Sequence, residues 1–215
     1  MSSRKLAAAV LLAFAPAVAQ SPLPTLRIEP TAGGSVFYIR NTASQPLTAY
    51  LIELVDYPGS SFWLCQDDII AEPIAPGAER RTPITNMTVG AVPDYVKMTA
   101  ALFADGSSAG STEKVALLVD ARRTTLETAR ELIRRVEQAQ SSGMSKDALV
   151  TGLRAYFTTL APQRGKAQEA IRRGTARNLI STTATGLNAA PFDKVLATLR
   201  AAEVRLAASK PGLQQ

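Results

Sequence analysis

Apolar and polar residues alternate in short runs over the first half of the chain, and turn-forming residues separate the runs. The clearest run extends from Tyr95 to Phe103. Apolar residues occupy alternate positions in it, with Lys97 and Thr99 between them: Val96, Met98, Ala100 and Leu102. A period of two places alternate side chains on opposite faces of a strand. We therefore predict a strand whose one face carries these four residues.

Runs rich in β-branched and aromatic residues predict six further strands, at 26–29, 36–39, 47–55, 62–65, 69–74 and 81–84. Polar or Gly- and Pro-containing turns separate them at 41–46 and 75–78, and Asp105-Gly106 follows the run that ends at Phe103. Short strands at this spacing predict an immunoglobulin-like antiparallel β-sandwich over residues 20–111. A small barrel is the alternative.

The pattern changes near residue 111 from a period of two to a helical period. Ser111 can cap a helix that begins at Thr112, in which apolar residues recur at helical spacing: Leu126, Ala129, Ile133 and Val136. The alternative is a last strand at 115–119, followed by a helix that begins at the capping box Thr124-x-x-Glu127. We favour one long helix.

Three more helices are predicted after the first. Ser145 caps the second, Pro162 suits the first turn of the third, and Pro191 opens the fourth. The second and fourth helices each carry a stripe of apolar residues, which predicts a small bundle over residues 112–210, with 211–215 as a tail. The stripe on the second helix is Leu149, Leu153, Tyr156 or Phe157, and Leu160, and that on the fourth is Phe192, Leu196, Leu199 and Leu206. The predicted fold class is thus α+β. The bundle either packs on the sandwich or folds separately.

The first 19 residues have the three-part order of a secretory signal peptide. Arg4 and Lys5 precede an apolar run from Leu6 to Ala15, and Ala17-Val18-Ala19 supplies small residues before Gln20. A membrane anchor is the alternative, but ten apolar residues span only about 15 Å as a helix, against a hydrocarbon core of about 30 Å. We expect cleavage near Ala19 and a periplasmic or extracellular product with no transmembrane segment.

The 215 residues include no histidine, and this excludes more chemistry than any motif suggests. Ser-His-Asp and Cys-His nucleophile systems require histidine, as do many zinc, copper and non-haem iron sites. The sequence identifies no catalytic, cofactor-binding or metal-binding residue and implies no cofactor.

Two local patterns deserve a chemical interpretation. Ser111-x-x-Lys114 matches the nucleophile motif of β-lactamases, but the companion motifs are absent, so we favour a helix cap with a solvated lysine. Asp67 and Asp68, with Asp56 and Glu72 nearby in the sequence, could act as a carboxylate pair or bind Ca²⁺. Adjacent strand residues point to opposite faces, so we favour a charged loop between two strands.

Trp63 and Cys65 lie in one apolar run, Phe62 to Cys65. We expect Trp63 to pack between the two sheets, as single large aromatics do in sandwiches. Cys65 is the only cysteine, so it is either a buried thiol, which we favour, or a residue that pairs with a second copy of the chain.

Charge is divided between the two halves. Residues 20–111 hold 5 Lys+Arg against 9 Asp+Glu, whereas residues 112–215 hold 17 against 9. Arginine pairs and single basic residues contribute to the excess: Arg122-Arg123, Arg134-Arg135, Arg172-Arg173, Arg164, Lys166 and Arg177. They form either a surface for anionic partners or solvated faces with interspersed glutamates. Export argues against nucleic acid as the partner.

The segment Val96 to Gly110 (VKMTAALFADGSSAG), continuing through 113–135, resembles a group of uncharacterised exported bacterial proteins, found mainly in soil bacteria such as acidobacteria. The Asn-Thr-x-Ser-x-Pro-Leu-Thr-Ala-Tyr segment at 41–50 resembles them too. The likeness covers roughly residues 34–140. It implies an exported protein with a β-sandwich and a long Arg-rich helix, and it carries no activity.

Export, the predicted fold and the lack of a catalytic constellation together predict a non-catalytic binding or interaction module of the cell envelope or the secreted fraction. Its partners would be envelope proteins or an anionic envelope surface. The alternative is an exported hydrolase that uses carboxylates or the Ser111–Lys114 pair.

Overall fold

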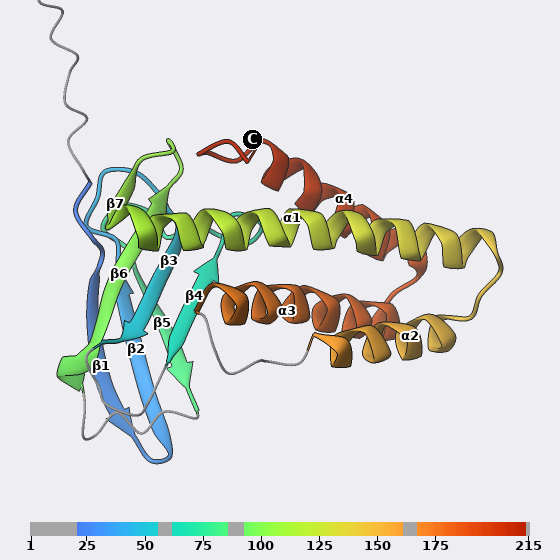
Figure 1. Cartoon of the computed structure of the whole chain (residues 1–215), viewed down its shortest axis with the longest axis horizontal. Coiled ribbons are helices and arrows are strands. Elements are labelled where there is room, and N and C mark those ends of the chain that lie inside the picture. Colours follow the sequence, from blue (N-terminus) through green and yellow to red (C-terminus); the bar gives the residue numbers. More distant parts are fainter. Residues whose placement is uncertain (1–20, 56–61, 86–92, 161–166, 214–215) are drawn as a thin grey trace, which may run out of the picture.

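The computed structural model describes residues 21–55, 62–85, 93–160 and 167–213. Two antiparallel sheets occupy its N-terminal part and four helices its C-terminal part (Figure 1). The α+β class predicted from the sequence is therefore confirmed. The predicted signal segment 1–19 lies outside the described residues.

The first sheet has the order β1-β2-β5 and the second the order β4-β3-β6-β7. The strands are β1 (Thr25–Thr31), β2 (Gly34–Arg40), β3 (Leu47–Leu54), β4 (Trp63–Asp67), β5 (Glu79–Ile84), β6 (Val96–Phe103) and β7 (Ser108–Gly110), and a short 3₁₀ turn, η2 (Pro93–Tyr95), precedes β6. Neighbouring strands approach closely at Gly110, where a Cβ atom would lie 2.1 Å from the carbonyl oxygen of Thr99. Only glycine fits there.

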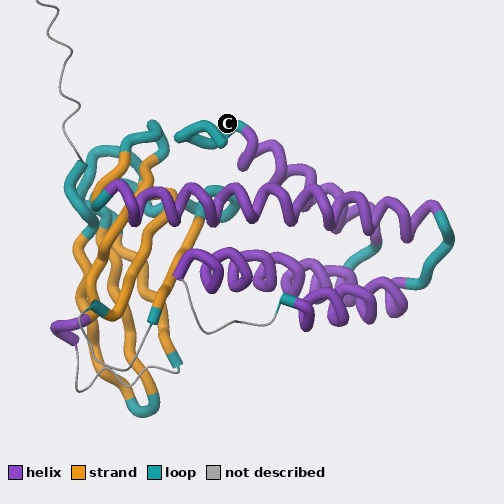
Figure 2. The backbone as a smooth tube through the Cα atoms, in the orientation of Figure 1, coloured by secondary structure: helices purple, strands orange, loops and turns teal. Residues whose placement is uncertain are grey.

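The strands of the two sheets lie next to each other (Figure 2). One hydrophobic core is enclosed between the sheets. The first sheet contributes Phe37 and Ile39 from β2. The loop residue Ile74 belongs to the same core, and the second sheet contributes side chains from β3, β6 and β7: Leu47, Tyr50, Ile52, Val96, Met98, Ala101, Phe103 and Ala109. Asn41, buried in the 41–46 turn, donates from its amide to the carbonyls of Gln45 and Ile74 and so fixes this turn against the core.

A β-bulge in β6 changes which face its residues occupy. Leu51 pairs with Ala100 but Ile52 pairs with Met98, so Thr99 is an extra residue. Its hydroxyl donates to the buried carboxylate of Glu53 at 2.6 Å. Val96 and Met98 therefore face the first sheet, whereas Ala100 and Leu102 face the helices. The prediction that these four share one face is wrong.

The segment 69–74, predicted as a strand, is a turn with a single bridge between Ile74 and Leu47. The carboxylate of Asp67 accepts a hydrogen bond from the N–H of Ile69 at 3.1 Å. Such a local side-chain bond competes with the sheet ladder and ends β4 here. The seventh strand is instead β7, which follows the Asp105-Gly106 turn; Gly106 has φ +94°.

The helices are α1 (Thr112–Ser141), α2 (Lys146–Thr159), α3 (Ala167–Ala189) and α4 (Phe192–Ala207). Ser111 caps α1 and Ser145 caps α2, since each hydroxyl accepts from a backbone N–H three residues on. The prediction of one long first helix is confirmed, and the alternative strand at 115–119 is wrong. Pro162, predicted in the first turn of the third helix, lies outside the described residues.

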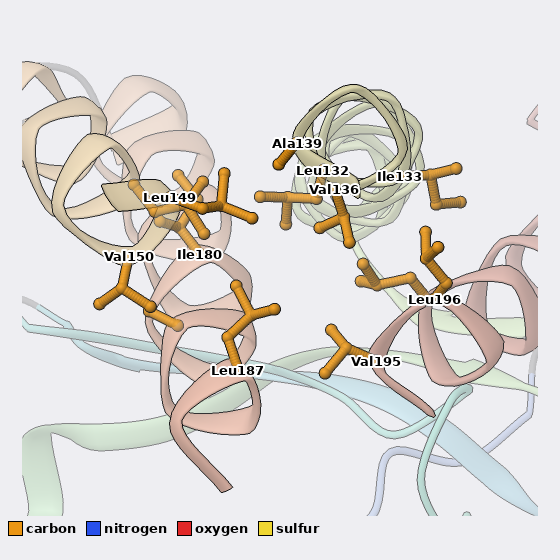
Figure 3. Close-up of a cluster of buried hydrophobic side chains, with 13 residues drawn as sticks. Leu132, Ile133, Val136, Ala139, Leu149, Val150, Ile180, Leu187, Val195 and Leu196 are labelled. Atoms are coloured by element: carbon orange, nitrogen blue, oxygen red, sulfur yellow. The ribbon is translucent and has the colours of Figure 1, made fainter. Parts of the chain in front are cut away.

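The far ends of the helices enclose a core of their own (Figure 3). It is formed by apolar side chains from all four helices, among them Leu132, Val136, Leu149, Leu153, Ile180, Leu187, Val195 and Leu199. Leu149, Leu153, Leu196, Leu199 and Leu206 are buried as the helical spacing predicted. Within the described residues, no helix is both long and apolar enough to cross a membrane.

The near ends of α1 and α3 cover the outer face of the second sheet. Ala49, Leu51, Ala100 and Leu102 are fully buried against Leu118, Ala121 and Ile171. The second sheet therefore has a hydrophobic core on each side, and the helical region packs on the sheets.

Candidate functional site

A cavity of about 330 Å³ lies between β4, α1 and the first half of α3. All five residues of β4 line it, from Trp63 to Asp67. Ala121 and Thr125 from α1 and Ile171, Gly174 and Asn178 from α3 form other parts of its wall. Figure 1 shows the start of α3 beside β4. Ligand pockets in proteins have volumes of about 300–1,000 Å³, so this cavity has room for a ligand.

Strand β4 has a different set of side chains on each face. Phe62, just before it, and Leu64 pack into the core between the sheets, whereas Trp63 and Cys65 pack toward α1 and α3. Trp63 also donates from its indole N–H to Glu53 at 3.1 Å. The prediction that Trp63 packs between the two sheets is therefore wrong, because the helices give the second sheet another apolar side.

The α3 wall of the cavity consists largely of small or uncharged polar side chains. Ala170, Gly174 and Asn178 recur every four residues and so share one face of the helix. A Cβ atom added to Gly174 would have no neighbour within 4 Å. The four-residue spacing of these side chains was the available sequence signal for the cavity.

Arg122 and Asp67 form an ion pair beside the cavity. The guanidinium of Arg122 is fully buried, and it donates to both carboxylate oxygens of Asp67, at 2.7 and 3.1 Å. It also donates to the hydroxyl of Thr48 at 3.0 Å and to the carbonyl of Lys210 at 2.8 Å. The negative charge of Asp67 in the cavity wall is thus balanced by the positive charge of Arg122.

Asp68 points away from Asp67, toward the first sheet. It pairs with Arg80 of β5 and accepts from the amide of Gln66 at 2.8 Å. Burial raises the pKa of Asp68, and the interactions with Gln66 and Arg80 oppose that rise. The two carboxylates do not converge, as the alternation along a strand predicted. Asp67 is the last residue of β4 and Asp68 begins the segment between β4 and β5, so the prediction of a charged loop between two strands is right only for Asp68. Asp56 lies outside the described residues.

Ser111 and Lys114 have separate roles at the start of α1. The Ser111 hydroxyl caps the helix, accepting from the Lys114 N–H at 3.4 Å. The Lys114 ammonium is 2.8 Å from the buried carboxylate of Glu53, so the predicted solvated lysine is wrong. This lysine is engaged in a salt bridge and is a poor base for a serine nucleophile.

Each member of the helical arginine pairs lies near an acidic side chain, but Asp120 and Glu131 each serve two arginines. Arg123 and Arg172 both approach Asp120, at 4.0 and 3.7 Å, and Arg134 and Arg135 both pair with Glu131. Similar pairing occurs along α3 between Glu169 and Arg173. Arg177 stacks on Phe157, with 3.9 Å between the guanidinium carbon and the ring centroid. Arg164 and Lys166 lie outside the described residues.

Cys65 is a half-buried free thiol on the cavity wall. Burial raises its pKa to about 12, the Asp67 carboxylate adds to the rise, and Arg122 opposes it. A thiol with such a pKa is a weak nucleophile at neutral pH, since the thiolate is the reactive form. Cys65 therefore acts here as a small apolar side chain.

In the described part of the chain, no group of three or more Cys, Asp or Glu side chains is arranged to hold a metal ion. Comparison with protein-family models, with curated proteins and with solved structures gives no match. The resemblance to exported bacterial proteins therefore stays a prediction. Any functional conclusion depends on the cavity and the groups around it.

Proposed function

We propose that this chain is an exported, non-catalytic binding protein of the cell envelope, and that it binds its partner in the cavity between β4 and α3. The observation that supports this most directly is the chemistry of the lining. Apolar side chains such as Trp63 and Ile171 line the cavity together with a few uncharged polar ones such as Asn178. Binding sites in general combine these two kinds of group.

The state of the nearby ionisable groups favours binding over hydrolysis. Glu53, Asp67 and Asp68 are each held by a basic partner, Lys114, Arg122 and Arg80 respectively. A general acid or base needs a carboxyl group that is free to exchange a proton with a substrate. The alternative, an exported hydrolase using carboxylates or Ser111 and Lys114, lacks this kind of support.

We further propose that the two sheets form an immunoglobulin-like sandwich. β2 pairs with β5 in one sheet, and β3, β6 and β7 lie side by side in the other. These neighbours correspond to the B–E and C–F–G pairings of that class. The helical arginines have acidic neighbours, but residues 112–215 still hold 17 Lys+Arg against 9 Asp+Glu, so an anionic envelope surface is a second candidate partner beside an envelope protein.

The test uses the full chain, produced with its own N-terminal segment and recovered from the envelope fraction of the producing cell. If the chain is exported and cleaved, the intact mass of the recovered protein should be that of a chain that begins at Gln20. The recovered protein is incubated with an extract of the envelope, and native mass spectrometry then measures what stays bound. The same measurement is made for Gly174→Trp, which fills the cavity, and for Gly152→Trp.

Gly152 is a matched control, because it is also a helical glycine with open space around a would-be Cβ and it lies outside the cavity lining. We expect the wild type and Gly152→Trp to retain the same species and Gly174→Trp to lose it. Equal retention by both variants, or no retained species at all, would refute the proposal.

A further inference from the structure

The free edge of β4 differs from the other sheet edges of the described chain. Exposed strand edges are usually protected by charge, proline or shortness. β1 carries Arg27, Glu29 and Pro30, β5 carries two arginines and Pro83, and β7 has only three residues. β4 has no proline and a single charged residue, Asp67 at its end; its sequence is Trp-Leu-Cys-Gln-Asp.

The register of β4 on β3 decides which of its backbone groups face the cavity. Phe62 and Asp68 make backbone hydrogen bonds with β3, to Leu54 and Thr48. Bonded and non-bonded pairs alternate along an antiparallel ladder. The N–H and C=O groups of Trp63, Cys65 and Asp67 therefore point away from β3, along the free edge.

No hydrogen-bond partner for these outward backbone groups is found in the part of the chain that the structure describes. The same three residues line the cavity, together with Leu64 and Gln66 between them. A cavity bounded by a whole strand, rather than by alternate residues, lies along the edge of that strand. The outward N–H and C=O groups of these three residues have the spacing needed to pair with the backbone of another extended chain.

The wall opposite β4 and the charge of the lining restrict the occupant. Ala170 and Gly174 leave width beside the strand, so α3 does not fill the space against the edge. Among the described residues of the lining Asp67 is the single charged one, and the buried guanidinium of Arg122 balances it. An uncharged segment is therefore the electrostatically complementary occupant, since a charged one would lose its hydration without gaining a partner.

We propose that the cavity binds an extended, uncharged polypeptide segment, which adds to the second sheet as a new strand hydrogen-bonded to Trp63, Cys65 and Asp67. The inference depends on the proposed binding function and names its partner. Main-chain hydrogen bonds along an open sheet edge are a known mode of peptide recognition. Alternate side chains of the segment would face α3, and the others would face away from the helices.

The probe is a pool of random hexapeptides with blocked ends and without Asp, Glu, Lys or Arg. Peptides retained by the immobilised full chain are identified and resynthesised singly. Binding is measured for the wild type, Cys65→Pro and Cys65→Val. Proline removes the outward N–H of residue 65 and places its ring on the free edge, where proline is compatible with pairing to β3. Valine keeps the N–H.

We expect Cys65→Pro to bind at least ~10-fold more weakly than Cys65→Val, which also replaces the thiol but keeps the N–H; a factor of ten corresponds to about 1.4 kcal/mol of lost interaction. In the wild-type complex, hydrogen exchange should slow at the N–H groups of Trp63, Cys65 and Asp67. Absence of retained peptides, or unchanged exchange at these three groups, would overturn the proposal.

A second measurement does not depend on whether Cys65→Pro folds. Each retained peptide is N-methylated at every second residue, in the two possible phases. Strand addition requires one phase to lose binding at least ~10-fold and the other to keep it, because only alternate N–H groups face β4. Equal loss in both phases contradicts strand addition. If Gly174→Trp abolishes retention from the envelope extract while no peptide binds, the proposed binding function survives and the strand-addition proposal fails.

Discussion

Arg122 shows how a single residue can connect distant parts of this chain. It lies on α1, and its guanidinium holds Asp67 at the end of β4, Thr48 in β3 and the carbonyl of Lys210 after α4. In the sequence it is the first member of a basic pair, and it was counted toward a basic surface. Its partners are 55 to 88 residues away, so no local pattern reveals that it is buried.

We expect Arg122→Met to lower the free energy of unfolding by roughly 3–5 kcal/mol, because it leaves the Asp67 carboxylate without its partner in a poorly hydrated position. Urea unfolding of the wild type and the variant measures the loss. The control is Arg122→Met combined with Asp67→Leu, which removes both charges and should recover most of the stability. If Arg122→Met alone is as stable as the wild type, the ion pair between Arg122 and Asp67 does not stabilise the fold.

Tyr50 provides a test of burial through pH. Its ring is buried between the sheets, and burial raises the pKa of its hydroxyl to about 12, against a weaker opposing effect of the hydrogen bond with Thr82. The folded state therefore keeps a proton that the unfolded state loses above about pH 10. The free energy of unfolding should fall as pH rises from 10 to 12.

The contribution of Tyr50 to that fall is isolated by Tyr50→Phe, which cannot ionise. We expect the wild type to lose roughly 2 kcal/mol more than the variant between pH 10 and 12, given about 1.4 kcal/mol per unit of pKa shift. Denaturant unfolding at pH 9, 10, 11 and 12 provides the comparison. Parallel curves for the two proteins would mean that Tyr50 ionises freely in the folded state.

At the scale of elements, local patterns predicted most strands and the starts of three helices. Ser111, Ser145 and Pro191 stand at the boundaries where α1, α2 and α4 begin. Capping depends on groups within one turn of each other, so the sequence contains the information. The turns at Gly77 and Gly106 were predicted for the same reason, and both glycines have positive φ.

The errors at this scale come from contacts between elements. The bulge at Thr99 is stabilised by Glu53, which is 46 residues away, and it reverses the facing of half of β6. Both faces of this strand are apolar, so the alternation in its sequence did not show which residues face which core. The cavity was missed likewise, because β4 and α3 come together only in the folded chain.

For the whole molecule, the second sheet belongs to two cores at once. Its inner face packs on the first sheet and its outer face on α1 and α3. A β-domain cut off after Ser111 would expose Ala49, Leu51, Ala100 and Leu102 to water. Burial of apolar surface contributes about 25 cal/mol per Å² to stability, so the contact between this sheet face and the helices is a substantial part of the free energy that stabilises the fold.

We therefore expect the sheets and the helices to unfold in one cooperative transition. Trp63 is the only tryptophan and lies where the helices meet the sheet, so its fluorescence reports on that contact. Circular dichroism at the helical wavelength reports on α1 to α4. Coincident urea transitions by both probes confirm a single unit, and a helical signal that survives the fluorescence change would show that the bundle folds independently.

The length of α1 determines how far the molecule reaches. Its first turns lie on the second sheet, where Lys114, Leu118 and Arg122 make their contacts. The remaining residues, Arg123 to Ser141, rise about 29 Å at ~1.5 Å each, beyond the sheet. A partner held at β4 and a second molecule touching the α1–α2 turn would thus be kept apart by nearly the diameter of a small domain. The length of α1 therefore sets the distance between the proposed binding site and the opposite end of the molecule.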